Sequence, residues 1–517
     1  MYKLGIDVGG TNTDAVLIDE DLNVVAAVKN PTSDDIYTGI MGAVDAVLAD
    51  SGVDRAQIAQ AMLGTTQCTN AIVERKGLAP IAILRIGAPA TVGIPPMVDW
   101  ADDIASVCVD SLIIEGGFEY DGKRLAEFDE AACRAFFEGV KGRVEAVAVS
   151  SVFSTVRNDD ELRAATIARE VLGEDVHVSI SSEIGSMGLI ERENATILNA
   201  ALYDVARKFT EGFAASLADK GVTNAEVYLS QNDGTLMTME HARRYPILTI
   251  ACGPTNSIRG ASYLSRRDDA IVIDVGGTTT DLGVLSHGFP RESGVAVTIG
   301  GVRTNFRMPD LVSVGLGGGS LVRQLEDGSM TVGPDSVGYL VTKKARCFGG
   351  DTLTATDIVV AKGLAEGVGD PALVADLDPA LVDAAYVEIT RIIEDAVDAM
   401  KTSAGDVTVI LVGGGSILAP DRLEGSDNVL RPENFGVANA VGSAIAQVSG
   451  QIAKVFSLTE TPCDQALAES KQRACDEAIE AGADPSTVEV VDVEDIPMAY
   501  LGDALCIRVK AVGDLML

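Results

Sequence analysis

The stretch that decides the fold is LGIDVGGTNTDAVLI at residues 4–18, because it returns almost unchanged as IVIDVGGTTTDLGVL at residues 271–285. Each copy consists of an apolar strand, the pattern D-V-G-G-T-x-T-D and a second apolar strand. This pattern predicts a β-hairpin with a Gly-Gly turn. Two near-identical hairpins so far apart in one chain indicate a duplicated domain, and we expect their equivalent loops to face each other.

The residue types in these turns point to a bound polyphosphate. Glycines let the backbone approach a phosphate closely, and successive amide groups form an anion-binding concavity. The aspartate before each turn, Asp7 or Asp274, would repel phosphate unless Mg²⁺ lies between them. We therefore expect a magnesium–nucleotide complex held from two sides.

A third glycine element, TVILVGGGS at residues 408–416, follows another apolar strand. A strand that ends in glycines leaves a flat surface on which a purine and a ribose can lie. We expect Gly413, Gly414, Gly415 and Ser416 to contact the adenosine.

The rest of the chain alternates strand and helix patterns. Apolar spacing predicts a long helix around 188–217 and another whose stripe runs from Val437 to Val455, while a polar helix is expected at 464–481. Alternating strands at 488–493 and 506–512 then suggest a small α/β appendage from residue 457.

Composition excludes several classes of protein. The 517 residues have a formal net charge of −36, which opposes binding to nucleic acid or anionic lipid. No apolar run approaches the roughly 18–20 residues that span a bilayer, and the N-terminus lacks signal-peptide features, so we expect a cytoplasmic protein. The eight cysteines form no C-x-x-C pair and the three histidines lie far apart, which argues against a zinc site and a disulfide framework.

The order of phosphate loop, second phosphate loop and adenosine loop resembles the actin/hexokinase/Hsp70 superfamily. Within it, the chain resembles the hydantoinase A/5-oxoprolinase family from residue 1 to about 455. The strings that carry this resemblance include GTTQCTNAIVERKG (64–77), ERENATILNA (191–200), SQNDG (230–234), ACGP (251–254), SVGLGGGS (313–320) and FGVANAVG (435–442).

The resemblance implies an α/β protein with duplicated ribonuclease-H-like (actin/hexokinase-type) lobes around an ATP cleft. We expect an N-terminal lobe at 1–190, a core lobe at 191–456 and the appendage at 457–517. The implied activity is ATP-dependent opening of a cyclic amide, such as a hydantoin, 5-oxoproline or another lactam, through phosphorylation of the amide oxygen. The implied cofactors are ATP and Mg²⁺, and the implied partner is a second, B-type subunit within an oligomer.

Carried over residue by residue, the resemblance makes Asp7 and Asp274 catalytic and magnesium-positioning residues. Its expected phosphate contacts are Gly9, Gly10, Thr11, Asn12 and Thr13 in the first loop and Gly276, Gly277, Thr278, Thr279 and Thr280 in the second. Asp14 and Asp281 are expected to order the threonines or to act as caps. Arg192 is a candidate to neutralise developing negative charge, with a surface ion pair as the alternative. Substrate contacts are expected from Thr65, Thr66 and Asn70, with packing as the alternative.

The chain departs from the family at Ser313, where relatives commonly have histidine, at Cys252, where they have serine, and around Cys347. These departures leave the substrate and any transition metal open, and both thiols are expected to be buried and structural rather than reactive. Two other functions stay open: a small-molecule kinase of the same superfamily, and a nucleotide-switched activator.

Overall fold

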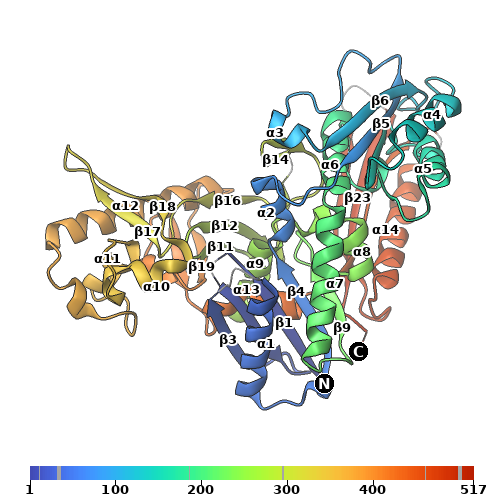
Figure 1. The fold of residues 1–517 in the computed structure, drawn as a ribbon. Helices are drawn as coiled ribbons and strands as arrows, with labels where there is room; N and C mark the ends of the chain where they lie inside the picture. Colours follow the sequence, from blue (N-terminus) through green and yellow to red (C-terminus); the bar gives the residue numbers. More distant parts are fainter. Residues whose placement is uncertain are drawn as a thin grey trace.

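The computed structural model describes residues 1–10, 12–31, 36–185, 187–293, 296–459, 461–498 and 503–516. Its largest sheet is nine-stranded and forms the base of the first lobe (Figure 1). The strand order is β22 (Glu489–Pro497), β23 (Ala504–Gly513), β21 (Val448–Ser457), β10 (Leu236–Thr238), β9 (Glu226–Ser230), β4 (Ile58–Thr65), β1 (Tyr2–Val8), β2 (Asn12–Ile18) and β3 (Val24–Pro31).

The second lobe repeats the plan of the first. Its main sheet has the order β13 (Phe289–Pro290), β12 (Thr280–Ser286), β11 (Ala270–Val275), β19 (Val407–Val412) and β20 (Ser426–Leu430), with β16 (Leu311–Val314) also paired to β12. In both lobes the first two strands form an antiparallel hairpin, and the first strand pairs in parallel with the fourth. If these five strands are counted in chain order within each lobe, both sheets have the order 3-2-1-4-5, from β3 to β9 in the first lobe and from β13 to β20 in the second. This shared order confirms the expected duplicated α/β fold.

A separate parallel sheet lies between β4 and β9 in the sequence and forms the upper right of Figure 1. Its order is β6 (Cys108–Glu115), β5 (Ile81–Ala88), β7 (Ala146–Ser151) and β8 (His177–Ile180), covered by α4 (Glu130–Val140) and α5 (Asp159–Leu172). Two ribbons, β14 (Val297–Ile299) with β15 (Val302–Thr304) and β17 (Ser320–Gln324) with β18 (Met330–Ser336), belong to the segment after β13.

Two helices, α9 (Cys252–Ser265) and α13 (Ala438–Ile445), lie between the two main sheets (Figure 1). They cross closely at glycines. A Cβ atom at Gly260 would lie 1.8 Å from the carbonyl oxygen of Ala438, and one at Gly442 would lie 1.8 Å from that of Asn256. Because only glycine permits this approach, α9 can reach the adjoining ends of both hairpins.

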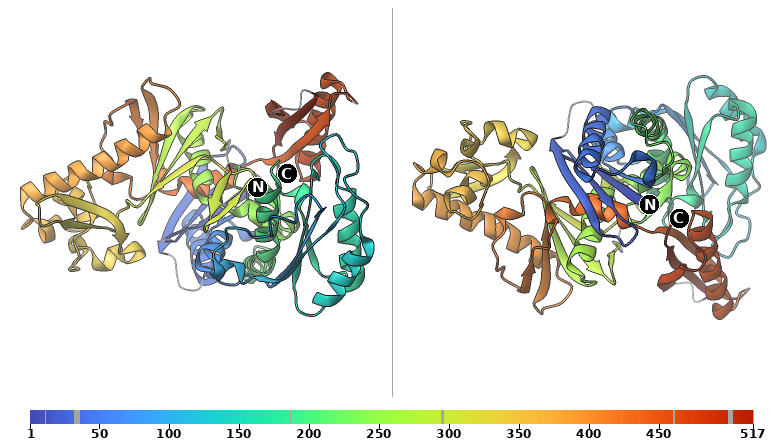
Figure 2. Two further views of the ribbon diagram at one scale, coloured as in Figure 1. Left: turned by 90° about the horizontal axis from the view of Figure 1, so that it is seen from above. Right: turned by 90° about the horizontal axis from the view of Figure 1, so that it is seen from below.

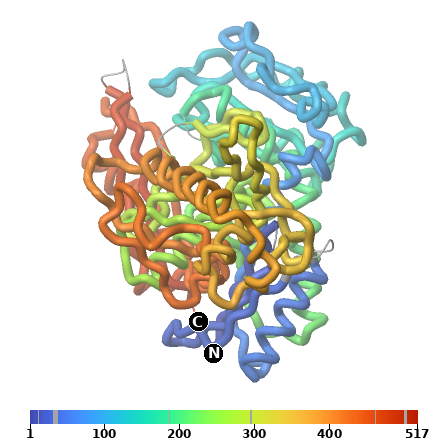
Figure 3. Tube along the Cα trace, turned by 90° about the vertical axis from the view of Figure 1, so that its left-hand side faces the viewer, coloured from blue at the N-terminus to red at the C-terminus, as the bar shows by residue number. Residues whose placement is uncertain are grey.

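The outer faces of the sheets are closed by other helices. Apolar residues of α1 (Ile36–Ser51) and α7 (Tyr203–Asp219) pack on the first sheet, and those of α11 (Ala355–Ala361) and α12 (Pro379–Met400) pack on the second. In the view of Figure 3, α12 runs across the front of the molecule. The remaining helices are α2 (Gln67–Glu74), α3 (Asp102–Ala105), α6 (Leu189–Ala201), α8 (Met239–Arg244), α10 (Val341–Lys344) and α14 (Cys463–Glu480).

The helix expected from Val437 to Val455 is wrong. The structure has the short helix α13 and then strand β21, which begins at Val448. The apolar residues of this stretch fit a helical period, but pairing of β21 with β10 and β23 decides the conformation. Gly450 supports the strand, because its Cα lies so close to α14 that a Cβ would be 2.1 Å from a carbonyl oxygen.

The long helix expected around 188–217 is divided into α6 and α7, which meet at Leu202. The polar helix and the two strands expected after residue 457 are present as α14, β22 and β23. These strands extend the nine-stranded sheet through β21, so the last segment is joined to the first lobe by hydrogen bonds. The domain boundaries expected from the sequence stay predictions.

In the part of the chain that the structure describes, we find no helix that combines the length and apolar character needed to cross a bilayer.

Candidate nucleotide site

The two Gly-Gly turns have the same geometry. The amide of Gly9 donates to the carbonyl of Asn12 at 3.0 Å, and the amide of Gly276 donates to that of Thr279 at 2.9 Å. Asp7 pairs across its hairpin with Asp14, and Asp274 pairs with Asp281. The expected equivalence of the two loops is therefore present in the backbone, although Thr11 lies outside the described residues.

Asp7 is buried at the end of β1 and is held by helices of the cleft. Asn256 of α9 donates to its Oδ1 at 3.2 Å, and Asn439 of α13 donates to its Oδ2 at 2.9 Å. Burial raises the pKa of Asp7 to about 6, and the negative charges of Asp14 and Asp274 add to this effect. The site therefore brings carboxylates of both lobes near one another in an environment that a cation would stabilise.

Asp274 has the equivalent place in the second lobe, where the hydroxyl of Ser257 donates to its Oδ2. Burial raises the pKa of Asp274, although this hydrogen bond opposes the shift. Asn256 and Ser257 are consecutive residues of α9, so a single helical turn holds the leading aspartates of both hairpins. Burial also raises the pKa of Asp281 to about 6, against a hydrogen bond from Ser313.

A lysine that the sequence analysis did not single out lies between the lobes. Lys29 of β3 is paired with Asp14 across the sheet, and its Nζ donates to both carboxylate oxygens at 2.8 and 2.7 Å. Its positive charge also lowers the pKa of Asp274, and a Cβ at Gly414 would lie 3.5 Å from its Cε. Lys29 therefore brings a cation to the junction of the first lobe and the adenosine loop.

Glycines beside the two leading aspartates leave room for their carboxylates. A Cβ at Gly64, which is paired with Asp7, would lie 2.2 Å from Oδ1 of Asp7. A Cβ at Gly413 would lie 2.1 Å from Oδ1 of Asp274, and Gly413 has φ +83°. Gly413 requires glycine, whereas a side chain at Gly64 would displace the carboxylate of Asp7, and the sequence alone did not reveal this role of Gly64.

The third glycine element packs against the second turn. The amide of Gly415 donates to Val275 at 2.7 Å, and the buried hydroxyl of Ser416 has no hydrogen-bond partner among the described residues. Residues 313–320 also pack against the second turn. The amides of Gly318 and Gly319 donate to the carbonyls of Gly276 and Gly277 at 3.0 and 2.8 Å. The structure thus brings the second Gly-Gly turn and the 413–416 element together.

The expected substrate residues begin beside the first loop. The Thr66 hydroxyl is 3.5 Å from the carbonyl of Val8 and accepts from Asn70 at 3.4 Å, while the Thr65 hydroxyl accepts from the amide of Gln67 at 3.3 Å. Asn70 also lines a hollow of about 280 Å³ between α2 and α7. Their roles toward a substrate stay predictions.

Arg192 is buried in another part of the molecule, at the carboxyl edge of the four-stranded sheet. It donates to the hydroxyl of Ser181 at 3.0 Å and to the carbonyl of Ser151 at 2.7 Å. Burial lowers the pKa of Arg192, and the charge of Glu161 opposes this shift. These contacts hold the loops of that sheet together, so the structure supplies a packing role, and the catalytic role stays a prediction.

The two cysteines expected to be buried and structural, Cys252 and Cys347, are deeply buried. The thiol of Cys252 donates to the carbonyl of Thr65 at 3.3 Å, and Cys347 is 1% exposed. Burial raises the pKa of each thiol to about 12. Both are protonated near neutral pH, in agreement with the structural role expected from the sequence.

The described residues do not gather three or more histidine, cysteine or carboxylate groups at a point where they could hold a metal. Asp7 and Asp274 approach from opposite lobes, and the oxygens of Asp7 are already engaged by two amides. This donor set suits Mg²⁺, which binds to one or two carboxylates and completes its shell with water and phosphate oxygens.

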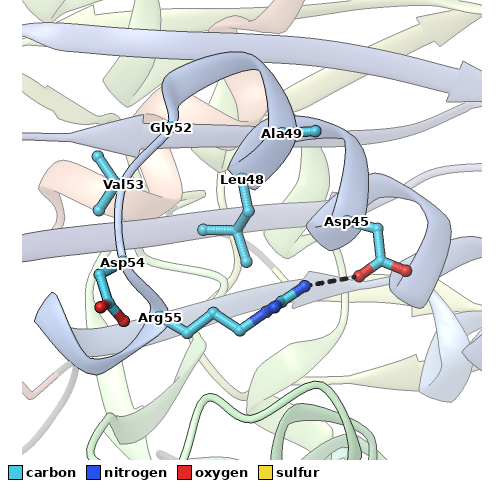
Figure 4. A pocket seen from close by; sticks show the side chains of 7 residues that line it. All are labelled: Asp45, Leu48, Ala49, Gly52, Val53, Asp54 and Arg55. Atoms are coloured by element: carbon cyan, nitrogen blue, oxygen red, sulfur yellow. Dashed lines mark ion pairs between the residues drawn. The ribbon is translucent and has the colours of Figure 1, made fainter.

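A larger hollow of about 730 Å³ lies at the end of α1 (Figure 4). It is lined by Asp45, Leu48, Ala49, Gly52, Val53, Asp54 and Arg55. Arg55 and Asp45 form an ion pair of 3.5 Å across it, and none of the glycine loops contributes to its wall. We assign no chemistry to it.

Duplicated lobes with equivalent acid-and-glycine turns define a duplicated α/β fold. Family comparison gives the particular group: residues 3–172 match the hydantoinase/oxoprolinase N-terminal region and residues 192–367 match the hydantoinase/oxoprolinase domain. The chain therefore belongs to the hydantoinase/oxoprolinase family.

Relatives and a solved structure agree with this placement. The chain is 26% identical to the caprolactamase subunit alpha of Pseudomonas jessenii, over 86% of this chain and 65% of that one. It is 24% identical to the acetone carboxylase beta subunit of Xanthobacter autotrophicus, over 70% and 54% of the two chains. The crystal structure of the ATP-dependent caprolactamase of P. jessenii superimposes with a TM-score of 0.79 at 20% identity, covering this whole chain and 88% of the other. The chain spans less than two thirds of the length of the caprolactamase subunit alpha and of the acetone carboxylase beta subunit.

Proposed function

We propose that this protein is the ATP-using subunit of an enzyme that opens a cyclic amide, a hydantoin, 5-oxoproline or another lactam. The observation that carries the proposal concerns Asp7 and Asp274, which each lie near the end of the first strand of a Gly-Gly hairpin. Both accept hydrogen bonds from consecutive residues of α9, Asn256 and Ser257. Membership of the hydantoinase/oxoprolinase family and the likeness to a caprolactamase subunit support the substrate class.

In this proposal, the amides of Gly9, Gly10, Gly276 and Gly277 bind the phosphates of ATP, and the 413–416 loop contacts its adenosine. Asp7 and Asp274 hold the Mg²⁺ that accompanies the nucleotide. Lys29 moves its ammonium group from Asp14 to the terminal phosphate, where it neutralises charge as the phosphoryl group is transferred. Its position beside Gly414 and its influence on Asp274 support this role.

The chemistry explains why ATP is needed. An unstrained cyclic amide resists attack because resonance strengthens its C–N bond. Transfer of the terminal phosphoryl group to the amide oxygen, with release of ADP, makes the carbon a better electrophile. Attack by water then breaks the C–N bond, and hydrolysis of the phosphoryl ester releases phosphate and the ring-opened acid.

A second subunit is expected to complete the reaction. The caprolactamase relative is named as a subunit, and this chain corresponds to 65% of its length. We propose that phosphorylation occurs in this chain and that water attacks in a partner. Co-purification with the product of a neighbouring gene, followed by activity measurements on each subunit alone, tests this division.

The test of the main proposal is ATP cleavage measured with and without candidate rings. Release of ADP that depends on a hydantoin or lactam, with ring opening in equal amount, is the expected result. Asp7→Asn and Asp274→Asn are each expected to abolish it, whereas the exposed Asp398→Asn control on α12 retains it. Full turnover in both site variants would contradict the assignment.

A second candidate function follows from the carboxylase relative. In an ATP-dependent carboxylase the activated oxygen belongs to a ketone or to bicarbonate rather than to an amide. The acetone carboxylase beta subunit is 24% identical to this chain, which favours this alternative over a sugar kinase. ADP release that requires bicarbonate and a ketone, and ignores every cyclic amide, would select it.

A further inference from the structure

The strands at the C-terminus present a charged face toward the centre of the molecule. Alternation along β23 places Cys506, Arg508 and Lys510 on one face, while Ile507 and Val509 on the other face pack in the core that includes α14. Figure 2 shows these red strands at the edge of the molecule, on the side of the four-stranded sheet. Buried positive charges such as those of Arg508 and Lys510 are costly unless they are paired with negative charges.

The innermost cation, Lys510, is fully paired. It is 4% exposed, and its Nζ lies 2.9 Å from Oδ2 of Asp233 and 5.1 Å from the ring centre of Phe289. Asp233 also accepts from Thr235 and Gln451. Because these contacts use the acceptor sites of Asp233, it has little capacity left for other cations.

Two arginines next to this pair have buried N–H groups without an acceptor among the described residues. Both Nη1 and Nη2 of Arg307 are buried, and neither has a hydrogen-bond partner among the described residues. Glu292 lies 3.4 Å from Nη1 without the geometry of a hydrogen bond, and it also attracts Lys510 at 3.8 Å. Arg508 donates Nη1 to Glu494 at 3.3 Å, but its Nε is buried without an acceptor.

The two arginines adjoin the same lysine, because Glu292 pairs with both Arg307 and Lys510, and Arg508 lies two residues before Lys510 on one face of β23. The positive charges of Arg508 and Arg307 both lower the pKa of the Cys506 thiol, against the larger effect of burial, which raises it. Arg259 of α9 contacts the same ring as Lys510, with its guanidinium 4.0 Å from the ring centre of Phe289. Its Nη1 donates to the carbonyl of Gly288, and its Nε is buried without an acceptor among the described residues. Gly234, with φ +80°, leaves space for this side chain, since a Cβ there would lie 2.8 Å from Cγ of Arg259.

Cations therefore exceed the available carboxylates in this cluster. Arg259, Arg307, Arg508 and Lys510 face Asp233, Glu292 and Glu494, and the donors left over belong to guanidinium groups. A guanidinium fork matches the oxygens of a carboxylate or a phosphate. A buried donor without an acceptor is costly, so the arrangement is suited to an anion from outside the chain.

We propose that Arg307 and Arg508, supported by Arg259 and Lys510, form a second binding site, for a small molecule that carries a carboxylate or a phosphate. The site lies between β23 and the residues Phe289, Glu292 and Arg307, and none of the glycine loops contributes a residue to it. Arg259 comes from the helix that also holds the aspartates of the nucleotide site, so an occupied anion site would adjoin that helix.

The test is calorimetric titration of the full chain with inorganic phosphate and, separately, with acetate, at constant ionic strength in a chloride-free buffer that contains saturating ADP and Mg²⁺. Phosphate that binds beside ADP in the glycine loops is common to all variants, so the comparison between variants isolates the arginine site. Arg307→Met is compared with Arg303→Met, a control in the same segment whose exposed side chain pairs only loosely, at 3.4 Å, with Glu191.

We expect saturable binding of at least one anion to the unmodified chain and to Arg303→Met, weakened at least tenfold in Arg307→Met. Tighter binding of acetate would identify a carboxylate ligand, and tighter binding of phosphate would identify a phosphate ligand. Equal affinity in Arg307→Met and the unmodified chain would overturn the proposal, as would no binding of either anion, because ordered water would then satisfy the arginines.

A second measurement protects the test against a folding defect. In anion-free buffer Arg307→Met should melt at the same temperature as the unmodified chain or higher, because it removes a buried charge without a hydrogen bond. If Arg307→Met does not fold, two other variants are titrated in its place. Arg307→Lys keeps the positive charge but loses the guanidinium group, and Arg508→Met removes the charge of the second arginine. No readout depends on ATP cleavage, so this result is independent of the proposed amide-opening activity.

Discussion

Replacing Gly64 by alanine should displace the carboxylate that the nucleotide site depends on. The new Cβ would lie 2.2 Å from Oδ1 of Asp7 and 2.5 Å from Nδ2 of Asn256, whereas real Cβ contacts stay beyond 3.0 Å. The carboxylate must therefore move by roughly 1 Å, and a displacement of that size in an active site can cost about 100-fold in rate. Loss of the hydrogen bond from Asn256 to the buried carboxylate should also reduce the free energy of unfolding by about 1.5–3 kcal/mol.

Two assays separate these effects. ADP release in the presence of Mg²⁺ reports the site, and urea unfolding reports stability. Gly253→Ala is the matched control, because it lies at the start of α9, close in sequence to Asn256, and its Cβ would meet nothing within 4 Å. We expect Gly253→Ala to retain activity and stability. If Gly64→Ala binds and cleaves ATP as well as the control does, then Asp7 does not act in the position that the structure gives it.

Three further results are expected. Lys29→Met should slow ATP cleavage about 100-fold or more, with part of the rate restored by Lys29→Arg, and equal rates in both variants would remove Lys29 from phosphate binding. Because the pKa of Asp7 is raised from 3.8 to about 6, the ligand-free protein should lose about 2 kcal/mol of unfolding free energy as pH rises from 4 to 6.5. Asp7→Asn should reduce the slope of that part of the urea-unfolding profile, to which Asp281 also contributes, and an unchanged slope would show that Asp7 titrates normally. Cys463, which is exposed, should react with iodoacetamide in the native protein while Cys252 and Cys347 react only after unfolding, and rapid labelling of Cys252 would contradict its burial.

The sequence was sufficient to predict the duplicated fold because the hairpin signal is local. Alternating apolar strands, a Gly-Gly turn and an aspartate at the strand end fix the conformation of residues 4–18 and 271–285 with little help from distant contacts. The same reasoning failed after Val437. Helical spacing of apolar residues does not distinguish a helix from a strand that is buried by pairing with β10 and β23.

The site was predictable only where a repeat marked it. Asp7 and Asp274 occupy the same position in the two repeated hairpin sequences, so the sequence alone predicts that they are equivalent. Lys29 has no such marker: its position follows from its pairing with Asp14 across the first sheet. Gly64 and Ser257 likewise belong to segments that reach the aspartates only when β4 and α9 pack beside them.

The sequence by itself thus determined that two acid-and-glycine turns exist and that their chemistry suits a magnesium–nucleotide complex. Only the tertiary structure decided which side chains surround those turns, and it alone gathered Arg259, Arg307, Arg508 and Lys510 from three separate parts of the chain. The physical reason is that turn conformation depends on neighbouring residues, whereas charge pairing and burial depend on distances between segments that the order of residues does not contain.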